Sequence, residues 1–179
     1  MKKNSSLYIR KLTYSALFLA LALVLPFLTG QIPQIGAMLS PMHYPVLLCG
    51  FVCGWPWGLA VGACAPILRS LIFGMPPMNT AIPMAFELAV YGLMAGLLYK
   101  LFPKKKLYVY VALILSMVAG RVVWGIVQYI MLGVAGTQFT AKMFLAGAVT
   151  NAVPGIILQI VLVPVLVFIM ERAKLSLNK

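Results

Sequence analysis

Long apolar runs, each separated from the next by a short turn-forming segment, make up most of the chain. A membrane-spanning helix needs about 20 mainly apolar residues, and a broken or tilted helix can use a shorter run. Glycine and proline cluster between the runs, as in residues 54–58 and 74–77, where they favour turns. The pattern predicts an all-α integral membrane protein, a bundle of six transmembrane helices that forms a single domain over residues 1–179. The predicted spans are residues 12–28, 42–53, 58–73, 81–101, 107–132 and 145–170.

The second predicted span, residues 42–53, is short for a bilayer. Three interpretations fit this length: the helix begins nearer Met38, it is tilted, or it is partly re-entrant. The first 30 residues also resemble a signal peptide, with a basic start and an apolar run. We reject that interpretation because the run is as long as a span and has no cleavage motif of small residues.

Lysine and arginine near the helix ends orient the bundle, because cytoplasmic loops carry the excess of these residues. Six spans place both termini on the same side, and only Lys142 falls on the opposite side. We therefore predict that the N and C termini are cytoplasmic. The basic residues on the side of the termini are Lys2, Lys3, Arg10, Lys11, Lys100, Lys104, Lys105, Lys106, Arg172, Lys174 and Lys179.

The composition supports a membrane protein and excludes other classes. Apolar residues make up 63% of the chain and charged residues 9%, against about 25% charged residues in soluble domains. Only two acids, Glu87 and Glu171, oppose 14 lysines and arginines. These numbers exclude a soluble enzyme and a disordered chain. The net charge of +12 could suggest nucleic acid binding, but the charges gather at the helix ends, so we expect no nucleic-acid partner.

Three charges fall inside predicted spans, where an isolated charge is costly. With about 1.5 Å of rise per residue, Arg69, Glu87 and Arg121 lie roughly 17, 20 and 22 Å from the cytoplasmic edge. In one interpretation they form a structural clamp. In the other they line a pocket open to the outside, and the surplus of one positive charge suits a ligand with a carboxylate or phosphate. Both can hold if one arginine pairs with Glu87 and the other is free.

Further polar or aromatic residues fall in the outer half of the predicted bundle, where they could contact a ligand. His43 begins the second span, and Trp124 and Gln128 follow Arg121 on the fifth. No catalytic residue, cofactor or metal site is predicted, because Cys49 and Cys53 lack partners to complete a metal site. The predicted substrate-binding residues are Arg69, Glu87, Arg121, Asn79, Trp124, Gln128, Asn151 and His43.

The chain lacks the motifs of an energy source. It has no phosphate-binding loop of the type G-x-x-x-x-G-K-[ST] and no G-x-S-x-G or H-E-x-x-H motif. We also find no internal repeat of the kind from which many secondary transporters are built. A bundle with buried polar groups and no ATP-hydrolysing motif indicates a non-enzymatic binding subunit. A partner protein would then power transport.

Several local motifs resemble those of the substrate-binding S components of energy-coupling factor (ECF) transporters, of the pantothenate type or unassigned. Residues 16–20 read Ala-Leu-Phe-Leu-Ala, a spacing of small residues that lets helices approach closely. The other motifs are Pro-Met-His-Tyr-Pro-Val-Leu-Leu-Cys-Gly at 41–50, Gly-Trp-Pro-Trp-Gly at 54–58, Pro-Ile-Leu-Arg-Ser at 66–70, Gly-Met-Pro-Pro at 74–77 and Glu-Leu-Ala-Val-Tyr-Gly at 87–92.

The resemblance implies a mechanism and partners. The segments 29–40 and 74–80 would cover a pocket that opens to the outside of a bacterial plasma membrane. Ala16 and Ala20 would dock on the transmembrane coupling subunit, and two ABC-type ATPases would drive the S component to topple and release its ligand inside. The expected ligand is a vitamin or related micronutrient that bears a carboxylate, pantothenate first, then pyridoxine-type vitamins or folates.

Two other function classes remain open from the sequence. A stand-alone secondary transporter could couple to protons through Glu87. A structural or assembly subunit would bind no ligand. Copurification of a coupling subunit and ATPases separates the ECF hypothesis from the stand-alone transporter.

Overall fold

The computed structural model describes residues 2–29, 32–103, 105–134, 136, 140–148 and 152–178. Every regular element in these ranges is helical, which confirms the predicted all-α class. The elements are α1 (Lys2–Val24), η1 (Leu25–Thr29), α2 (Pro33–Leu39), α3 (His43–Cys53), α4 (Trp55–Phe73), α5 (Met78–Leu101), α6 (Lys106–Val134), α7 (Ala141–Ala148) and α8 (Val153–Arg172).

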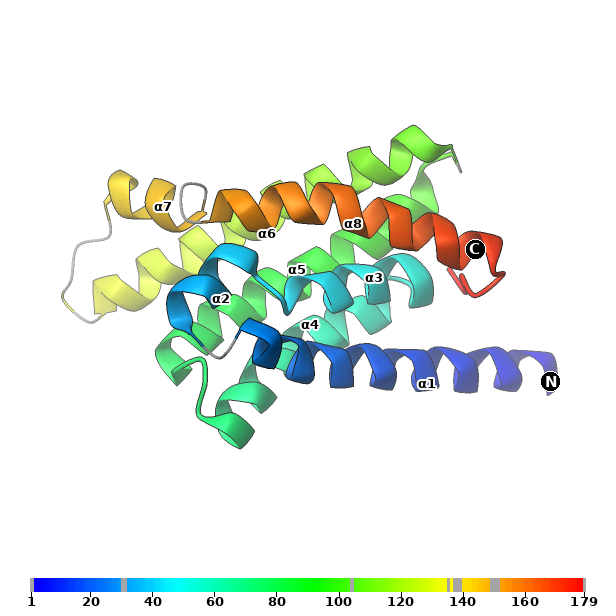
Figure 1. Ribbon diagram of the computed structural model, residues 1–179, viewed down its shortest axis with the longest axis horizontal. Helices are drawn as coiled ribbons and strands as arrows, with labels where there is room; N and C mark the ends of the chain where they lie inside the picture. The colour runs from blue at the N-terminus through cyan, green and yellow to red at the C-terminus, as the bar shows by residue number, and fades with distance from the viewer. Residues whose placement is uncertain are drawn as a thin grey trace.

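Five of the described helical segments are long and apolar enough to cross a membrane, and α3 is a shorter apolar helix. Both chain ends lie at the same end of the bundle, while α2 and α7 lie at the other end (Figure 1). The cytoplasmic position of the termini stays a prediction. The five segments are Ser5–Leu28, Trp55–Phe73, Met78–Leu101, Lys106–Val134 and Val153–Arg172.

The sixth predicted span, residues 145–170, was wrong at its start. In the structure α7 ends at Ala148 and α8 begins at Val153. Pro154 stands in the first turn of α8, where its missing N–H leaves no unsatisfied helical donor and its fixed φ suits a helix start.

The segment 29–40, expected to be a loop, contains the helix α2. Ser40 ends this helix in the left-handed region, with φ 49°, so α2 does not continue into α3. The backbone N–H of His43 then donates to the Ser40 carbonyl at 3.0 Å. The short second span therefore begins at His43 rather than near Met38, and α2 is a separate helix at its outer end.

Glycines bring α3, α4 and α5 into backbone contact. A Cβ atom on Gly62 would lie 2.2 Å from the Leu88 carbonyl oxygen, and one on Gly92 would lie 2.2 Å from that of Gly58. A Cβ on Gly50 would meet the Gly92 carbonyl at 2.5 Å. Only glycine fits at such distances, as in other closely packed membrane helices. We call this contact between α3, α4 and α5 the glycine seam.

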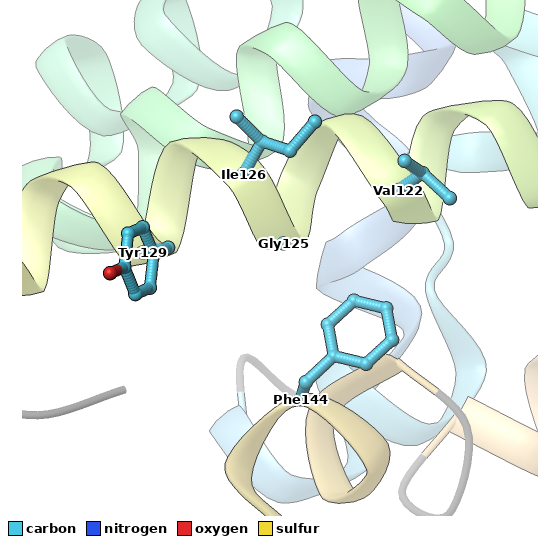
Figure 2. Close-up of a pocket in the computed structure, with 5 residues that line it drawn as sticks. All are labelled: Val122, Gly125, Ile126, Tyr129 and Phe144. Atoms are coloured by element: carbon cyan, nitrogen blue, oxygen red, sulfur yellow. The ribbon is translucent and has the colours of Figure 1, made fainter. Parts of the chain in front are cut away.

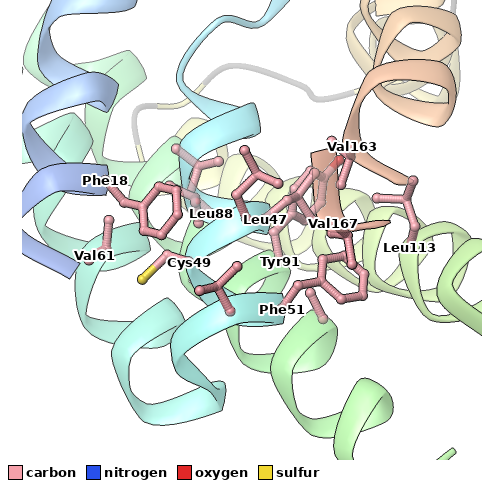
Figure 3. Close-up of a cluster of buried hydrophobic side chains, with 14 of the residues drawn as sticks. Phe18, Leu47, Cys49, Phe51, Val61, Leu88, Tyr91, Leu113, Val163 and Val167 are labelled. Atoms are coloured by element: carbon pink, nitrogen blue, oxygen red, sulfur yellow. The ribbon is translucent and has the colours of Figure 1, made fainter. Parts of the chain in front are cut away.

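The buried apolar core is formed by residues of α1, α3, α4, α5, α6 and α8 (Figure 3). Leu47 of α3, Tyr91 of α5 and Val163 of α8 are all fully buried in it. The C-terminal segment closes the end of the bundle at which the chain termini lie. The Leu177 N–H donates to the Val52 carbonyl at 2.8 Å, and the Asn178 side-chain amide donates to the Gly96 carbonyl at 3.0 Å.

Candidate ligand-binding site

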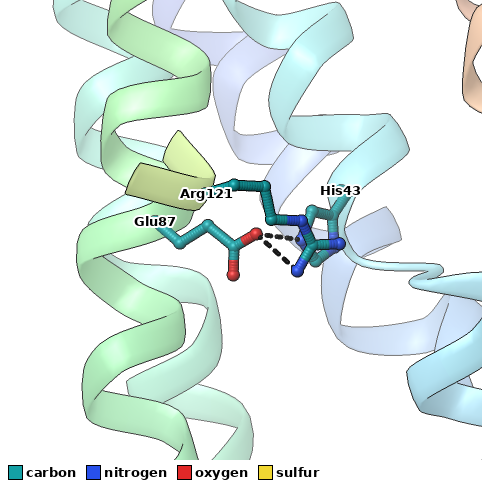
Figure 4. Close-up of polar contacts among 3 residues, drawn as sticks. All are labelled: His43, Glu87 and Arg121. Atoms are coloured by element: carbon teal, nitrogen blue, oxygen red, sulfur yellow. Dashed lines mark hydrogen bonds and ion pairs between the residues drawn. The ribbon is translucent and has the colours of Figure 1, made fainter. Parts of the chain in front are cut away.

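A buried carboxylate lies at the centre of the bundle, between a cation and an imidazole (Figure 4). The Glu87 Oε1 atom lies 3.0 Å from Arg121 Nη1 and 3.4 Å from His43 Nε2. The residues Glu87 and His43 are 2% and 3% exposed. A charged group at this depth is stable only if it is paired, and the geometry supplies that pairing.

The sequence positions these three residues through local features of α3, α5 and α6. His43 is the first residue of α3, directly after the turn at Ser40. Glu87 lies midway along α5, and Arg121 follows Gly120 on α6. A Cβ on Gly120 would lie 2.0 Å from the Tyr91 ring, so the glycine lets α6 approach α5. This close approach brings the Arg121 guanidinium within reach of Glu87.

Tyr91 lies one helical turn inward from Glu87 and forms the floor of the cluster. Its ring packs edge-on against His43, with ring centroids 5.2 Å apart. Its hydroxyl makes no hydrogen bond of regular geometry. Tyr91 was not predicted as a site residue, because a tyrosine inside an apolar helix resembles an ordinary core residue.

The helix register places Gln159 in the same layer as these charges. Helices α3, α5 and α8 run in the same direction (Figure 1). Leu47, Tyr91 and Val163 on these helices belong to one buried cluster (Figure 3), and His43, Glu87 and Gln159 each lie four residues before one of them. One turn of rise therefore sets all three at a common depth. Gln159 is 1% exposed. We call His43, Glu87, Tyr91, Arg121 and Gln159 the polar layer.

The polar layer holds several buried polar atoms without a hydrogen-bond partner. They are His43 Nδ1, Tyr91 Oη, Arg121 Nε, and both Gln159 Nε2 and Gln159 Oε1. More than nine in ten buried polar groups in proteins are hydrogen-bonded, and an unmet one costs about 1–3 kcal/mol. Such a concentration of unmet donors and acceptors is typical of a surface that binds a polar ligand.

A family comparison decides the class of the protein. The family model described as "ECF transporter, substrate-specific component" matches residues 10–167. The chain belongs to this family. It is a substrate-specific subunit of an ECF transporter and a multi-pass membrane protein. No curated protein and no solved structure matches the chain.

Family membership bears on one further prediction. Substrate-specific components of ECF transporters are transport-specificity subunits, which supports the prediction that this S component is not an enzyme. Among the residues that the structure describes, no group of three or more His, Cys, Asp or Glu side chains could hold a metal ion.

Arg69 of the S component makes its contacts away from the ion pair. Its Nη1 donates to the Leu23 carbonyl. Its guanidinium carbon lies 4.8 Å from the ring centroid of Phe27 and 5.3 Å from that of Phe73. Of the alternatives left open by the sequence, the described structure has Arg121 paired with Glu87 and Arg69 in other contacts, while His43 joins the pair. Gly62 of α4 lies against Leu88 of α5, and Gly58 against Gly92, so Arg69 lies beyond Glu87 along the bundle rather than level with it.

The remaining predicted site residues are not joined to Glu87 by any contact in the described part of the chain. Asn79 is exposed at the start of α5, and Gln128 is half-buried on α6. Trp124 packs on Phe144 of α7, with ring centroids 6.3 Å apart. Asn151 lies outside the described residues.

An apolar hollow of about 290 Å³ lies between α6 and α7 of the S component (Figure 2). It is distinct from the polar layer. Two of its lining residues, Ile126 and Tyr129, are more than half exposed. A side chain with this exposure on a membrane helix faces lipid, so the hollow does not enclose a polar ligand. The lining residues are Val122, Gly125, Ile126, Tyr129 and Phe144.

Proposed function

We propose that this S component binds a small polar vitamin or related micronutrient in the polar layer and passes it into a bacterial cell. The observation that carries this proposal is the set of unpartnered buried atoms on His43, Tyr91, Arg121 and Gln159 around the Glu87 ion pair. A ligand that meets these groups would recover hydrogen bonds that the protein alone does not make.

Helix α2 covers the outer side of this site. A Cβ on Gly155, one turn outward from Gln159 on α8, would lie 2.5 Å from the Met38 carbonyl oxygen. The Tyr44 hydroxyl also donates to the Leu39 carbonyl at 3.0 Å. The ligand would enter when α2 moves aside, in accord with the expected role of segment 29–40.

The face of α1 that carries Ala16 and Ala20 would dock on the transmembrane coupling subunit. Both alanines are exposed, whereas Phe18 and Ala22 are buried against the bundle. Small side chains allow a second helix to approach closely. Two ABC-type ATPases bound to that subunit would power the inward release of the ligand.

The charges of the polar layer favour an uncharged ligand. Glu87 and Arg121 neutralise each other at 3.0 Å, so the surplus positive charge inferred from the sequence is not in this layer. Among the expected vitamins, a pyridoxine-type ring fits this layer better than a carboxylate, since its ring nitrogen and hydroxyls can pair with Glu87 and the unmet donors.

A carboxylate-bearing ligand, such as pantothenate or a folate, is the second candidate. Arg69 favours it: this arginine is 2% exposed, and its described partners are a carbonyl and two aromatic rings rather than an acid. If Arg69 takes the carboxylate, Arg69→Met should weaken pantothenate binding by about 1.5–3 kcal/mol. An unchanged pantothenate affinity would exclude this role.

Copurification from native membranes tests the function itself. The tagged S component should bring down a transmembrane subunit and two ATPases, and mass spectrometry of the extracted small molecules should name the ligand. If the protein instead drives uptake in vesicles without any ATPase, the proton-coupled alternative through Glu87 replaces the ECF proposal.

A further inference from the structure

Gln159 stands out among the buried polar side chains of the described structure. It is 1% exposed, and neither its amide nitrogen nor its carbonyl oxygen has a partner. By contrast, the equally buried Ser116 donates to the Ala112 carbonyl at 2.6 Å. A buried amide with both ends unmet destabilises the protein, and an apolar residue of the same size would avoid this cost.

The surroundings of Gln159 determine what kind of ligand it can meet. The Glu87 carboxylate is already engaged by Arg121 and His43. The other buried polar atoms without a partner at this depth are on His43, Tyr91 and Arg121, and they are neutral or belong to the compensated ion pair. A carboxamide presents one donor and one acceptor side by side, which pair with a ligand edge that offers an acceptor and a donor on neighbouring atoms.

We propose that Gln159 determines substrate specificity by pairing with the amide-like edge of an uncharged ligand, while the layer around it recognises the rest of the molecule. This inference rests on the proposed function and adds a ligand class to it. A site built to hydrogen-bond such an edge rejects analogues that lack it, because its own buried groups are then left unmet. A carboxylate has two acceptors and no donor, so it leaves the Gln159 carbonyl oxygen unpaired.

The first test measures the ligand-free protein in detergent by thermal unfolding. Gln159→Met keeps the size of the side chain and removes the amide, and Ser116→Ala removes a buried polar group that is hydrogen-bonded. We expect Gln159→Met to raise the melting temperature by about 2–4 °C and Ser116→Ala to leave it unchanged or lower. A fall in both variants would mean that Gln159 has a structural partner, and would overturn the proposal.

The second test titrates wild type and Gln159→Met with matched pairs of small molecules. Each pair sets an uncharged amide against its carboxylate counterpart: nicotinamide against nicotinate, and benzamide against benzoate. We expect at least one amide to raise the melting temperature of the wild type more than its carboxylate counterpart does. In Gln159→Met, the apparent affinity for that amide should be at least tenfold lower. Stronger stabilisation by the carboxylates, or no response to either amide, would overturn the ligand class.

These outcomes are separable from failure of the proposed function. If the S component brings down no ATPase from native membranes but shows the expected amide preference, the binding role of Gln159 stands and the ECF role fails. If it assembles with the ATPases and prefers the carboxylates, the ECF role stands and the inference on Gln159 fails.

Discussion

Arg121 and Glu87 form a buried ion pair that joins α6 to α5, with 3.0 Å between Arg121 Nη1 and Glu87 Oε1. Removing one partner leaves the other charge buried without compensation. We expect Glu87→Gln and Arg121→Met each to lower the free energy of unfolding by about 3–5 kcal/mol. The double variant should lose much less than the sum, because no unpaired charge remains. Denaturant unfolding in detergent measures all three.

Glu171→Gln is the matched control for this pair. It also removes an acid, but one that lies near the end of α8 and accepts a hydrogen bond from Tyr99. Glu171→Gln should lower the free energy of unfolding by about 1 kcal/mol, the contribution of a single hydrogen bond. If the losses in free energy of unfolding of Glu87→Gln and Arg121→Met simply add in the double variant, the two charges do not stabilise each other.

Arg69 should act independently of Glu87, because its contacts are with Leu23, Phe27 and Phe73. A double-mutant cycle of Arg69→Met and Glu87→Gln should therefore give a coupling energy within about 0.5 kcal/mol of zero. The same cycle with Arg121→Met in place of Arg69→Met supplies the positive control. A coupling above 1 kcal/mol for Arg69 would restore the three-charge cluster expected from the sequence.

Bulky residues on the exposed face of α1 should separate ligand binding from transport. Ala16→Leu with Ala20→Leu should leave thermal stability and ligand retention unchanged and abolish uptake in cells that express all ECF subunits, because the partner helix can no longer approach. Ala146→Leu, also at an exposed alanine but on α7, is the control and should transport normally. Full uptake by the α1 variant would place the docking face elsewhere.

The glycine seam should be intolerant of a single methyl group. Gly62→Ala forces α4 from α5, since the new Cβ would lie 2.2 Å from the Leu88 carbonyl oxygen. We expect a loss of about 1–3 kcal/mol or more in the free energy of unfolding. Gly133→Ala is the control: nothing lies within 4 Å of its Cβ position, and the substitution should stabilise α6 by up to about 1 kcal/mol. Equal changes in the free energy of unfolding for Gly62→Ala and Gly133→Ala would contradict the close packing of the glycine seam.

Hydropathy and turn residues predicted the fold more closely than the site. They gave the helical class and the approximate positions of α1, α3, α4, α5 and α6. They missed α2 and began the last span too early, because the backbone conformation of Ser40 and the position of Pro154 decide these helix ends.

For the site, the sequence singled out Glu87, Arg121 and His43, since charged or ionisable groups are rare in apolar helices. It missed Gln159 and Tyr91. A lone amide or phenol gives no such signal until its depth and neighbours are known. It also placed Arg69 level with Glu87, because a depth counted from an estimated helix end does not include the offset between neighbouring helices, which their packing sets.

The glycine seam also limits where the molecule can open. Backbone atoms of α3, α4 and α5 touch through Gly50, Gly58, Gly62 and Gly92, so these helices can move only as one rigid body. Helix α8 is joined to α2 by an equally close contact, at Gly155 and Met38. If the site opens to a ligand, these contacts favour a separation of α2 and α8 from the seam, with Gln159 on the first group of helices and Glu87 on the second.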